Sequence, residues 1–315
     1  MAQVAIGISA YFAASTLLSL VAAAVLVVSL LASGGKDLSS LANLFSGGTQ
    51  DLLRLMRPTS AGGLVWAAAS LGSALAPVLV GWWVWREVSP LRWGLLPRAG
   101  WGREVAFGLL LGPVVFGVVT GLMVAFGLAA FSFGTLTAGM VPWAVIVFAP
   151  AALAEEWFMR GYVLQVIEDG YDLRLGVLIS SVLFGLLHAL NPNLTVLSLP
   201  NLLATGLVLA QAYLVTRRLW LPWAFHFSWN FTQMVVFGLP VSGLPGDGLL
   251  QAHVTGSALL TGGSFGPEGG ALCLVGLAVS SLLLWCYGRA FPPTWPPQRR
   301  EARAGGVVEP GRDQP

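Results

Sequence analysis

The feature that most constrains this chain is a series of long apolar segments that are nearly free of charge. A helix needs about 20 apolar residues to cross the hydrocarbon core of a bilayer. Eight segments have that character, at roughly 4–32, 61–85, 104–131, 142–167, 174–190, 198–216, 219–239 and 271–289. Backbone polar groups are satisfied in lipid only by helices and closed barrels, and these segments are too long for barrel strands. We therefore expect an all-α, polytopic bundle of about eight transmembrane helices.

The composition agrees with a surface that faces lipid. Charged residues make up 10% of the 315 residues and hydrophobic residues 56%, whereas a soluble domain carries about 25% charge. The net charge is only +2, and the chain lacks the basic face that binds nucleic acid. The lipid bilayer is thus an expected partner, and nucleic acid is not.

Basic residues alternate between loops and predict the orientation of the chain. They occur after the second, fourth, sixth and last spans, as Arg86, Arg92, Arg98, Arg103, Arg174, Arg217, Arg218, Arg299, Arg300 and Arg303. The loops at 132–141, 191–197 and 240–270 contain none. Since cytoplasmic loops are rich in Lys and Arg, eight spans place both termini in the cytoplasm. We expect a multi-pass protein of a bacterial inner (plasma) membrane.

One loop does not fit this alternation. Residues 33–60 should lie outside, yet they contain Lys36, Arg54 and Arg57. The stretch 51–57 also has the pattern of an amphipathic helix lying on the membrane surface. An interfacial or re-entrant first span, which would move the N-terminus, therefore stays open as an alternative.

Polar and ionisable residues inside membrane spans are expensive and usually functional, and this chain gathers them in three spans. Glu156 and Arg160 are four residues apart, so they share a helix face and are expected to pair. Glu155 is rotated by about 100° from Glu156, so we expect it to face a polar, water-filled intramembrane cavity. His226 and Asn230 are also four residues apart in the seventh span and point the same way.

Together with His188 in the fifth span, these groups suit the hydrolysis of a carbonyl compound. A partly desolvated glutamate is a stronger general base toward water. A nearby imidazole can hold that water or shuttle its proton, and a second imidazole with an amide can donate to the developing oxyanion. No serine or cysteine nucleophile is required.

Three motifs in these spans resemble the CPBP family of intramembrane proteases. The family includes the eukaryotic CAAX-processing endopeptidase and bacterial relatives linked to bacteriocin self-immunity and abortive infection. The resemblance covers about residues 100–240, and the motifs occur in the family's order and spacing. They are Glu155-Glu156-x-x-x-Arg160, Phe184-x-x-x-His188 and His226-x-x-x-Asn230.

The resemblance implies a role for each matching position. Glu155 corresponds to the catalytic glutamate, His188 to the histidine that helps to activate water, and His226 with Asn230 to the oxyanion-binding pair. For Asn230, a hydrogen bond between helices is the alternative.

The remaining motif positions, Glu156, Arg160 and Phe184, are implied to shape the site. A buried structural ion pair is the favoured interpretation of Glu156 and Arg160. Core packing is equally consistent with Phe184, and His253, in the loop before the last span, is expected to be exposed and uninvolved.

The spans, the resemblance and the Pro-, Gly- and charge-rich composition after residue 290 together suggest a division of the chain, and the resemblance implies a type of reaction. Residues 1–103 hold the N-terminal helices and interfacial loops, 104–290 form the protease core, and 291–315 form a disordered cytoplasmic tail. The substrate is expected to be a peptide or membrane protein, with no metal and no cofactor. Cys273 and Cys286 lie about 20 Å apart along one helix, too far for a disulfide.

Three other functions remain as alternatives. A catalytically silent membrane scaffold or immunity factor would keep the same residues as a stabilising polar network. A zinc-dependent membrane hydrolase would use Glu and His ligands, although no His-Glu-x-x-His motif is present. A proton-coupled transporter would also place Glu and His in spans, but matched Gly/Pro-broken spans are not evident.

Overall fold

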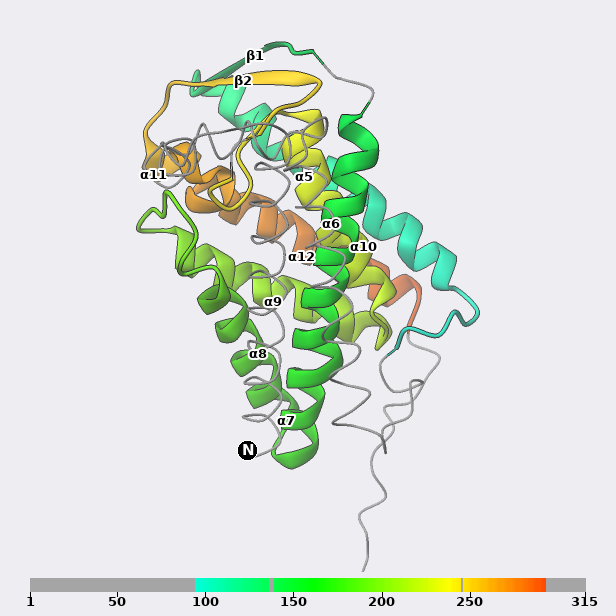
Figure 1. Ribbon diagram of the computed structural model, residues 1–315. Helices are drawn as coiled ribbons and strands as arrows, with labels where there is room; N and C mark the ends of the chain where they lie inside the picture. Colours follow the sequence, from blue (N-terminus) through cyan, green and yellow to red (C-terminus); the bar gives the residue numbers. More distant parts are fainter. Residues whose placement is uncertain (1–93, 136–138, 245, 293–315) are drawn as a thin grey trace, which may run out of the picture.

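The computed structural model describes residues 94–135, 139–244 and 246–292. The predicted spans at 4–32 and 61–85, the loop at 33–60 and nearly all of the tail lie outside these residues. The described part is mostly helical (Figure 1). It contains four helical segments that are long and apolar enough to cross a membrane: Trp101–Ala125, Met140–Gly170, Ser198–Thr216 and Leu272–Ala290.

The helices follow the predicted spans closely, apart from the C-terminal end of the third span. The third predicted span, 104–131, is helix α5 only over Trp101–Ala125. Its last residues leave the helix at Gly127, whose φ of 66° is in the left-handed region that favours glycine. They then enter strand β1, Ala129–Phe133. The prediction of helix over 126–131 is therefore wrong.

The fourth predicted span is one continuous helix whose type changes along its length. Helix α6, Met140–Glu156, passes into the π-helical segment η1, Trp157–Leu164, and then into α7, Gln165–Gly170. A π-helical segment is rare and occurs frequently at functional sites. Here it begins directly after two neighbouring glutamates.

Three of the remaining segments agree with the predicted spans to within three residues at each end. They are α8, Leu173–Leu187; α9, Ser198–Thr216; and α10, Trp220–Phe231, continued by the π-helical η2, Thr232–Val236. Helix α8 has 15 residues, a length of about 22 Å, which is shorter than a hydrocarbon core of about 30 Å. The last helix, α12, spans Leu272–Ala290.

A small antiparallel sheet closes one end of the bundle (Figure 1). Strand β1 pairs with β2, Leu250–Val254, with Ala129 opposite Val254 and Phe133 opposite Leu250. Between β2 and α12 lie three short turns of helix: α11, Ala258–Thr261; η3, Gly263–Phe265; and η4, Pro267–Gly269. The predicted loop 240–270 is thus largely structured.

Helix α10 is fixed tightly against α5. A Cβ on Gly108 would lie 2.7 Å from the Ala224 Cβ, so the two helices approach as closely as glycine permits. At Gly112 the Ser228 hydroxyl accepts a hydrogen bond from the Gly112 N–H at 3.2 Å and donates to the Gly108 carbonyl at 2.8 Å. The hydroxyl thereby bridges two groups four residues apart on α5.

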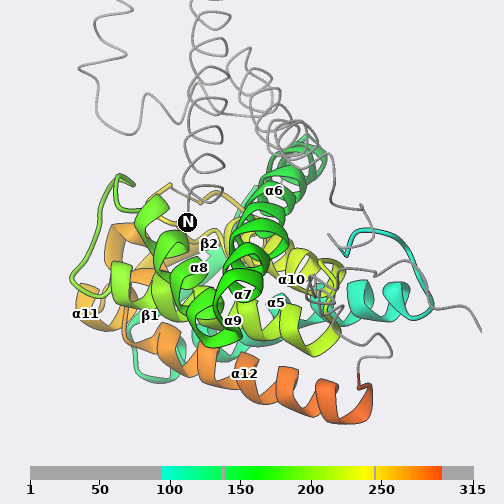
Figure 2. The same ribbon diagram turned by 90° about the horizontal axis from the view of Figure 1, so that it is seen from below.

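The helices enclose a core in which α9 and α10 occupy the middle. In the view of Figure 2, α12 and α6 lie on opposite sides of the bundle with α9 and α10 between them. The turn after α9 is tied to two other segments: Arg217 pairs with Glu168 and Arg218 with Glu104. Which end of the bundle is cytoplasmic stays a prediction.

Candidate active site

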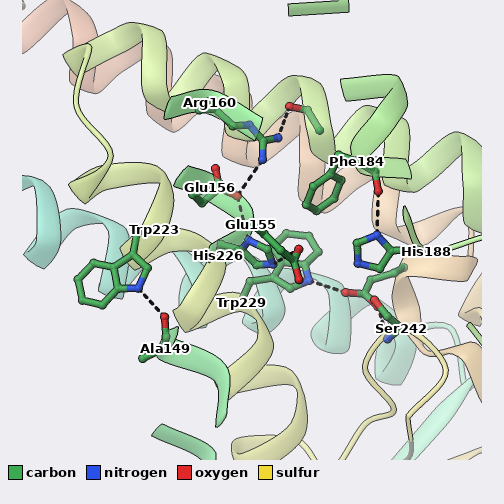
Figure 3. Close-up of polar contacts among 12 residues, drawn as sticks. Ala149, Glu155, Glu156, Arg160, Phe184, His188, Trp223, His226, Trp229 and Ser242 are labelled. Atoms are coloured by element: carbon green, nitrogen blue, oxygen red, sulfur yellow. Dashed lines mark hydrogen bonds and ion pairs between the residues drawn. The ribbon is translucent and has the colours of Figure 1, made fainter. Parts of the chain in front are cut away.

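The junction of α6 and η1 sends two neighbouring glutamates in different directions. Glu156 points into the protein, where its Oε1 accepts hydrogen bonds from Arg160 Nη1 and His226 Nδ1, both at 2.9 Å. Arg160 Nη2 in turn donates to the Gly206 carbonyl of α9 at 2.8 Å. Both charged side chains are 0% exposed. Figure 3 shows this chain from Arg160 through Glu156 to His226. The predicted Glu156–Arg160 pair is confirmed, and it also holds α10.

Glu155 points the other way and lines a cavity of about 390 Å³. Its side chain is 26% exposed, and its Oε2 lies 3.9 Å from His226 Nε2, too far for a hydrogen bond. That oxygen is itself buried and has no hydrogen-bond partner. Glu155 therefore presents a carboxylate to the cavity, as its position on the helix predicts.

His188 follows the end of α8 and lines the same cavity. Its Nδ1 lies 2.8 Å from the Phe184 carbonyl oxygen. A carbonyl only accepts, so Nδ1 carries the proton and Nε2 of the neutral ring is free to accept. In Figure 3 the Glu155 carboxylate lies between the imidazoles of His188 and His226.

Phe184 fills the space behind the two histidines. Its side chain is 2% exposed, and its ring centroid lies 5.0 Å from that of His188 and 5.7 Å from that of His226. The Arg160 guanidinium also lies over the ring, at 5.0 Å. Phe184 is thus both a core residue and a contact of the candidate site, so the two interpretations of it are compatible.

Helix α10 supplies His226 and Asn230, which both line the cavity. His226 is 7% exposed and is held through Glu156. The helix is further fixed to α6 by Trp223, whose Nε1 donates to the Ala149 carbonyl at 2.8 Å (Figure 3). The predicted residues of three spans are therefore brought together at one cavity.

The sequence analysis missed one residue of this cavity, Glu268 in η4. Its side chain is 4% exposed and lines the cavity. Its Oε1 accepts a hydrogen bond from Trp229 Nε1 at 3.1 Å, and its Oε2 accepts from the N–H and hydroxyl of Ser242 at 2.6 Å and 3.0 Å. The one signal in the sequence is an acidic residue close to the start of the last span, in a loop without Lys or Arg.

Other polar residues lie where the sequence places them, outside the chemistry. His253 is exposed on β2 and lies 3.1 Å from the Ser132 hydroxyl. Cys273 and Cys286 are free cysteines in α12. Within the described ranges, His, Cys, Asp and Glu form no group of three or more that could hold a metal ion.

Comparison with known protein families matches part of the chain. Residues 137–232 match the family described as type II CAAX prenyl endopeptidase Rce1-like. No curated protein and no solved structure is significantly similar to the chain. The matched segment contains all three motifs and most of the cavity residues, and it confirms the family resemblance.

Proposed function

We propose, from the match of residues 137–232 to the Rce1-like family of type II CAAX prenyl endopeptidases, that the chain is an intramembrane endopeptidase that uses Glu155 to activate water. The observation that carries this proposal is the environment of the Glu155 Oε2 atom. It is buried without a hydrogen-bond partner in the wall of a cavity that also contains both motif histidines. A carboxylate in that position has an unused lone pair for a proton from water.

The first step joins water to the peptide carbonyl. Glu155 takes one proton of the water while the water oxygen bonds to the carbonyl carbon, and the π electrons of the C=O bond move to its oxygen. His188 orients the water, because Nδ1 is committed to the Phe184 carbonyl and the ring accepts through Nε2. General base catalysis of this kind contributes about 10²–10⁴-fold.

The oxyanion formed in that step needs donors, which His226 and Asn230 supply in this proposal. Nδ1 of His226 already faces the Glu156 carboxylate at 2.9 Å. To donate to the oxyanion through Nε2 as well, the ring must carry both protons. Glu156, which also pairs with Arg160, and Glu155 are the carboxylates beside that imidazolium. One oxyanion donor is worth about 3–4 kcal/mol in the transition state.

The second step breaks the peptide bond. The electrons on the oxyanion re-form the C=O bond, the C–N bond breaks, and the leaving nitrogen takes the proton from Glu155. The products are a carboxylic acid, which still holds the second proton of the water, and an amine; transfer of that proton then gives a carboxylate and an ammonium group. This mechanism uses no covalent intermediate and assigns no step to a metal.

The substrate is proposed to be a peptide or membrane protein that enters from the bilayer. Much of the cavity wall is apolar, with Val147, Phe148, Leu202 and Leu209 among its lining residues. Such a wall suits the apolar side chains of a membrane-associated segment. We place the protein in a bacterial inner membrane with its arginine-rich end in the cytoplasm.

Cleavage of peptides by the purified protein tests this proposal. The wild type in detergent is incubated with a broad library of fluorogenic peptides, with and without a strong chelator. Cleavage that survives the chelator is expected. Cleavage lost with the chelator contradicts the metal-independent mechanism, and intact peptides in every well support a silent scaffold.

A further inference from the structure

Three glutamates among the described residues are buried, and their partners differ. Glu104 pairs with Arg218 and Glu156 with Arg160. Glu268 forms no ion pair with any Lys, Arg or His in the described ranges. Buried charges are normally paired, because an unpaired charge in a low-dielectric interior is costly. Glu268 is the exception that needs a reason.

Neutral groups hold the Glu268 carboxylate in place. The Trp229 indole N–H and the Ser242 backbone N–H only donate, so both carboxylate oxygens act as acceptors. The Ser242 hydroxyl adds a third hydrogen bond at 3.0 Å. These donors orient the carboxylate and replace part of its hydration, but they bring no positive charge.

The backbone that carries Glu268 is equally well fixed. Asn201 Nδ2 donates to the carbonyls of Glu268 at 2.8 Å and Gly270 at 2.9 Å. The Thr195 hydroxyl donates to the Gly269 carbonyl at 2.5 Å. The carboxylate is therefore held at a defined position by helix α9 and the loop before it.

The cavity that contains Glu268 is lined by two carboxylates, and its one cation in the proposed mechanism, the His226 imidazolium, is paired with Glu156 outside the lining. Its lining residues include Glu155 and Glu268 and two histidines, but no Lys or Arg from the described part of the chain. A cleft with an excess of negative side chains attracts ligands of the opposite sign. A cationic group entering this cavity would supply the charge that Glu268 lacks.

We propose that Glu268 forms a subsite that binds the side chain of a lysine or arginine in the peptide substrate, an inference that rests on the proposed endopeptidase function. A carboxylate offers about four acceptor positions. Trp229 and Ser242 use three of them, so one remains for an N–H of the ligand. Glu155 activates water, and Glu268 selects where along the peptide the cut falls.

The test compares peptide pairs that differ at one position, with lysine in one member and norleucine in the other. Both ends are blocked by acetylation and amidation, and the position is scanned through the cleaved region. We expect the wild type to prefer lysine in kcat/KM at one site or at two neighbouring sites. The expected preference is about 10- to 100-fold, the range of hydrogen bonds to charged groups.

Two variants locate the source of that preference. Glu268→Gln removes the charge with little change of shape and is expected to abolish the lysine preference, while norleucine peptides are still cut. Glu168→Gln is the matched control, because Glu168 lies outside the cavity and pairs with Arg217; it is expected to keep the preference. An unchanged preference in Glu268→Gln, or equal slowing of both members of each pair, overturns the subsite.

The other possible outcomes of this experiment also test the Glu268 subsite. If Glu268→Gln does not fold, the wild type alone is judged on lysine against glutamate at the same positions, and equal rates overturn the proposal. A lysine preference that is absent from the blocked peptides, and is found only when the same peptides are made with a free N-terminus, overturns the assignment to a side chain. If the wild type cuts nothing, the endopeptidase function fails, and anisotropy with the same labelled peptides tests the subsite separately. Equal binding of lysine and norleucine peptides then overturns it.

Discussion

Removing the Glu156 carboxylate is expected to leave a buried arginine without its counter-charge. Arg160 is 0% exposed and makes two side-chain hydrogen bonds, to Glu156 and to the Gly206 carbonyl. In Glu156→Leu only the Gly206 contact remains for a cation that offers five N–H donors. His226 loses its Nδ1 partner in the same variant.

The expected loss of folding free energy is about 3–5 kcal/mol, the cost of removing one partner from a buried ion pair. Replacing both charges is expected to cost much less, because an apolar pair of similar volume leaves no uncompensated charge. Arg160 also packs on Phe184, so methionine is the appropriate replacement for its length. We therefore expect Glu156→Leu/Arg160→Met to lie within about 2 kcal/mol of the wild type.

The assay is equilibrium unfolding in mixed micelles, followed by tryptophan fluorescence, on the wild type, both single variants and the double variant. The four values form a double-mutant cycle that isolates the interaction. A loss below about 1 kcal/mol in Glu156→Leu would refute the reasoning, since that is the size of an exposed pair. The reasoning would also be refuted if the double variant lost as much folding free energy as the two single variants lose in total.

Three further predictions follow from the packing and the arrangement of charges. Gly112→Val is expected to lose about 3 kcal/mol or more of folding free energy by overpacking, because a side chain there would overlap the backbone of α10. Gly117→Val is the control and should melt near the wild type, because a Cβ at Gly117 has nothing within 4 Å. Equal melting points of the two variants would contradict the close approach of α5 and α10. Arg217→Gln breaks a partly exposed ion pair and should cost less than about 1 kcal/mol in the same unfolding assay. In a cysteine-free background, Tyr171→Cys is expected to react with an impermeant thiol reagent only from the cytoplasmic side, and Phe133→Cys only from the outside; the reverse pattern would invert the orientation.

The sequence predicts the direction of a side chain well where that direction depends only on the geometry of one helix. Glu156 and Arg160 pair because residues four apart share a face, and Glu155 faces the cavity because it lies about 100° around the helix. The helical spacing of His226 and Asn230 likewise places both at the cavity. These inferences need only the geometry of a single element.

Contacts between elements could not be predicted from the sequence. The bond from His226 to Glu156 depends on how α10 packs against α6, and no local pattern sets that register. Glu268 reaches the cavity from a segment that follows α10 by more than thirty residues, where the sequence is mostly glycine-rich and apolar and has no pattern that places one acidic residue at the site. Residues 129–133 are as apolar as the helix before them, so their pairing with β2 decides their strand structure.

The rate of peptide hydrolysis by Glu155→Gln tests the central claim most directly. It is measured beside the wild type and Glu168→Gln, with the melting temperature of each protein taken from the same preparation. The proposed mechanism predicts that Glu155→Gln melts like the wild type but loses at least about 100-fold in kcat, the lower range for a general base, while Glu168→Gln keeps its rate. A Glu155→Gln protein that cleaves as fast as the wild type would contradict the mechanism.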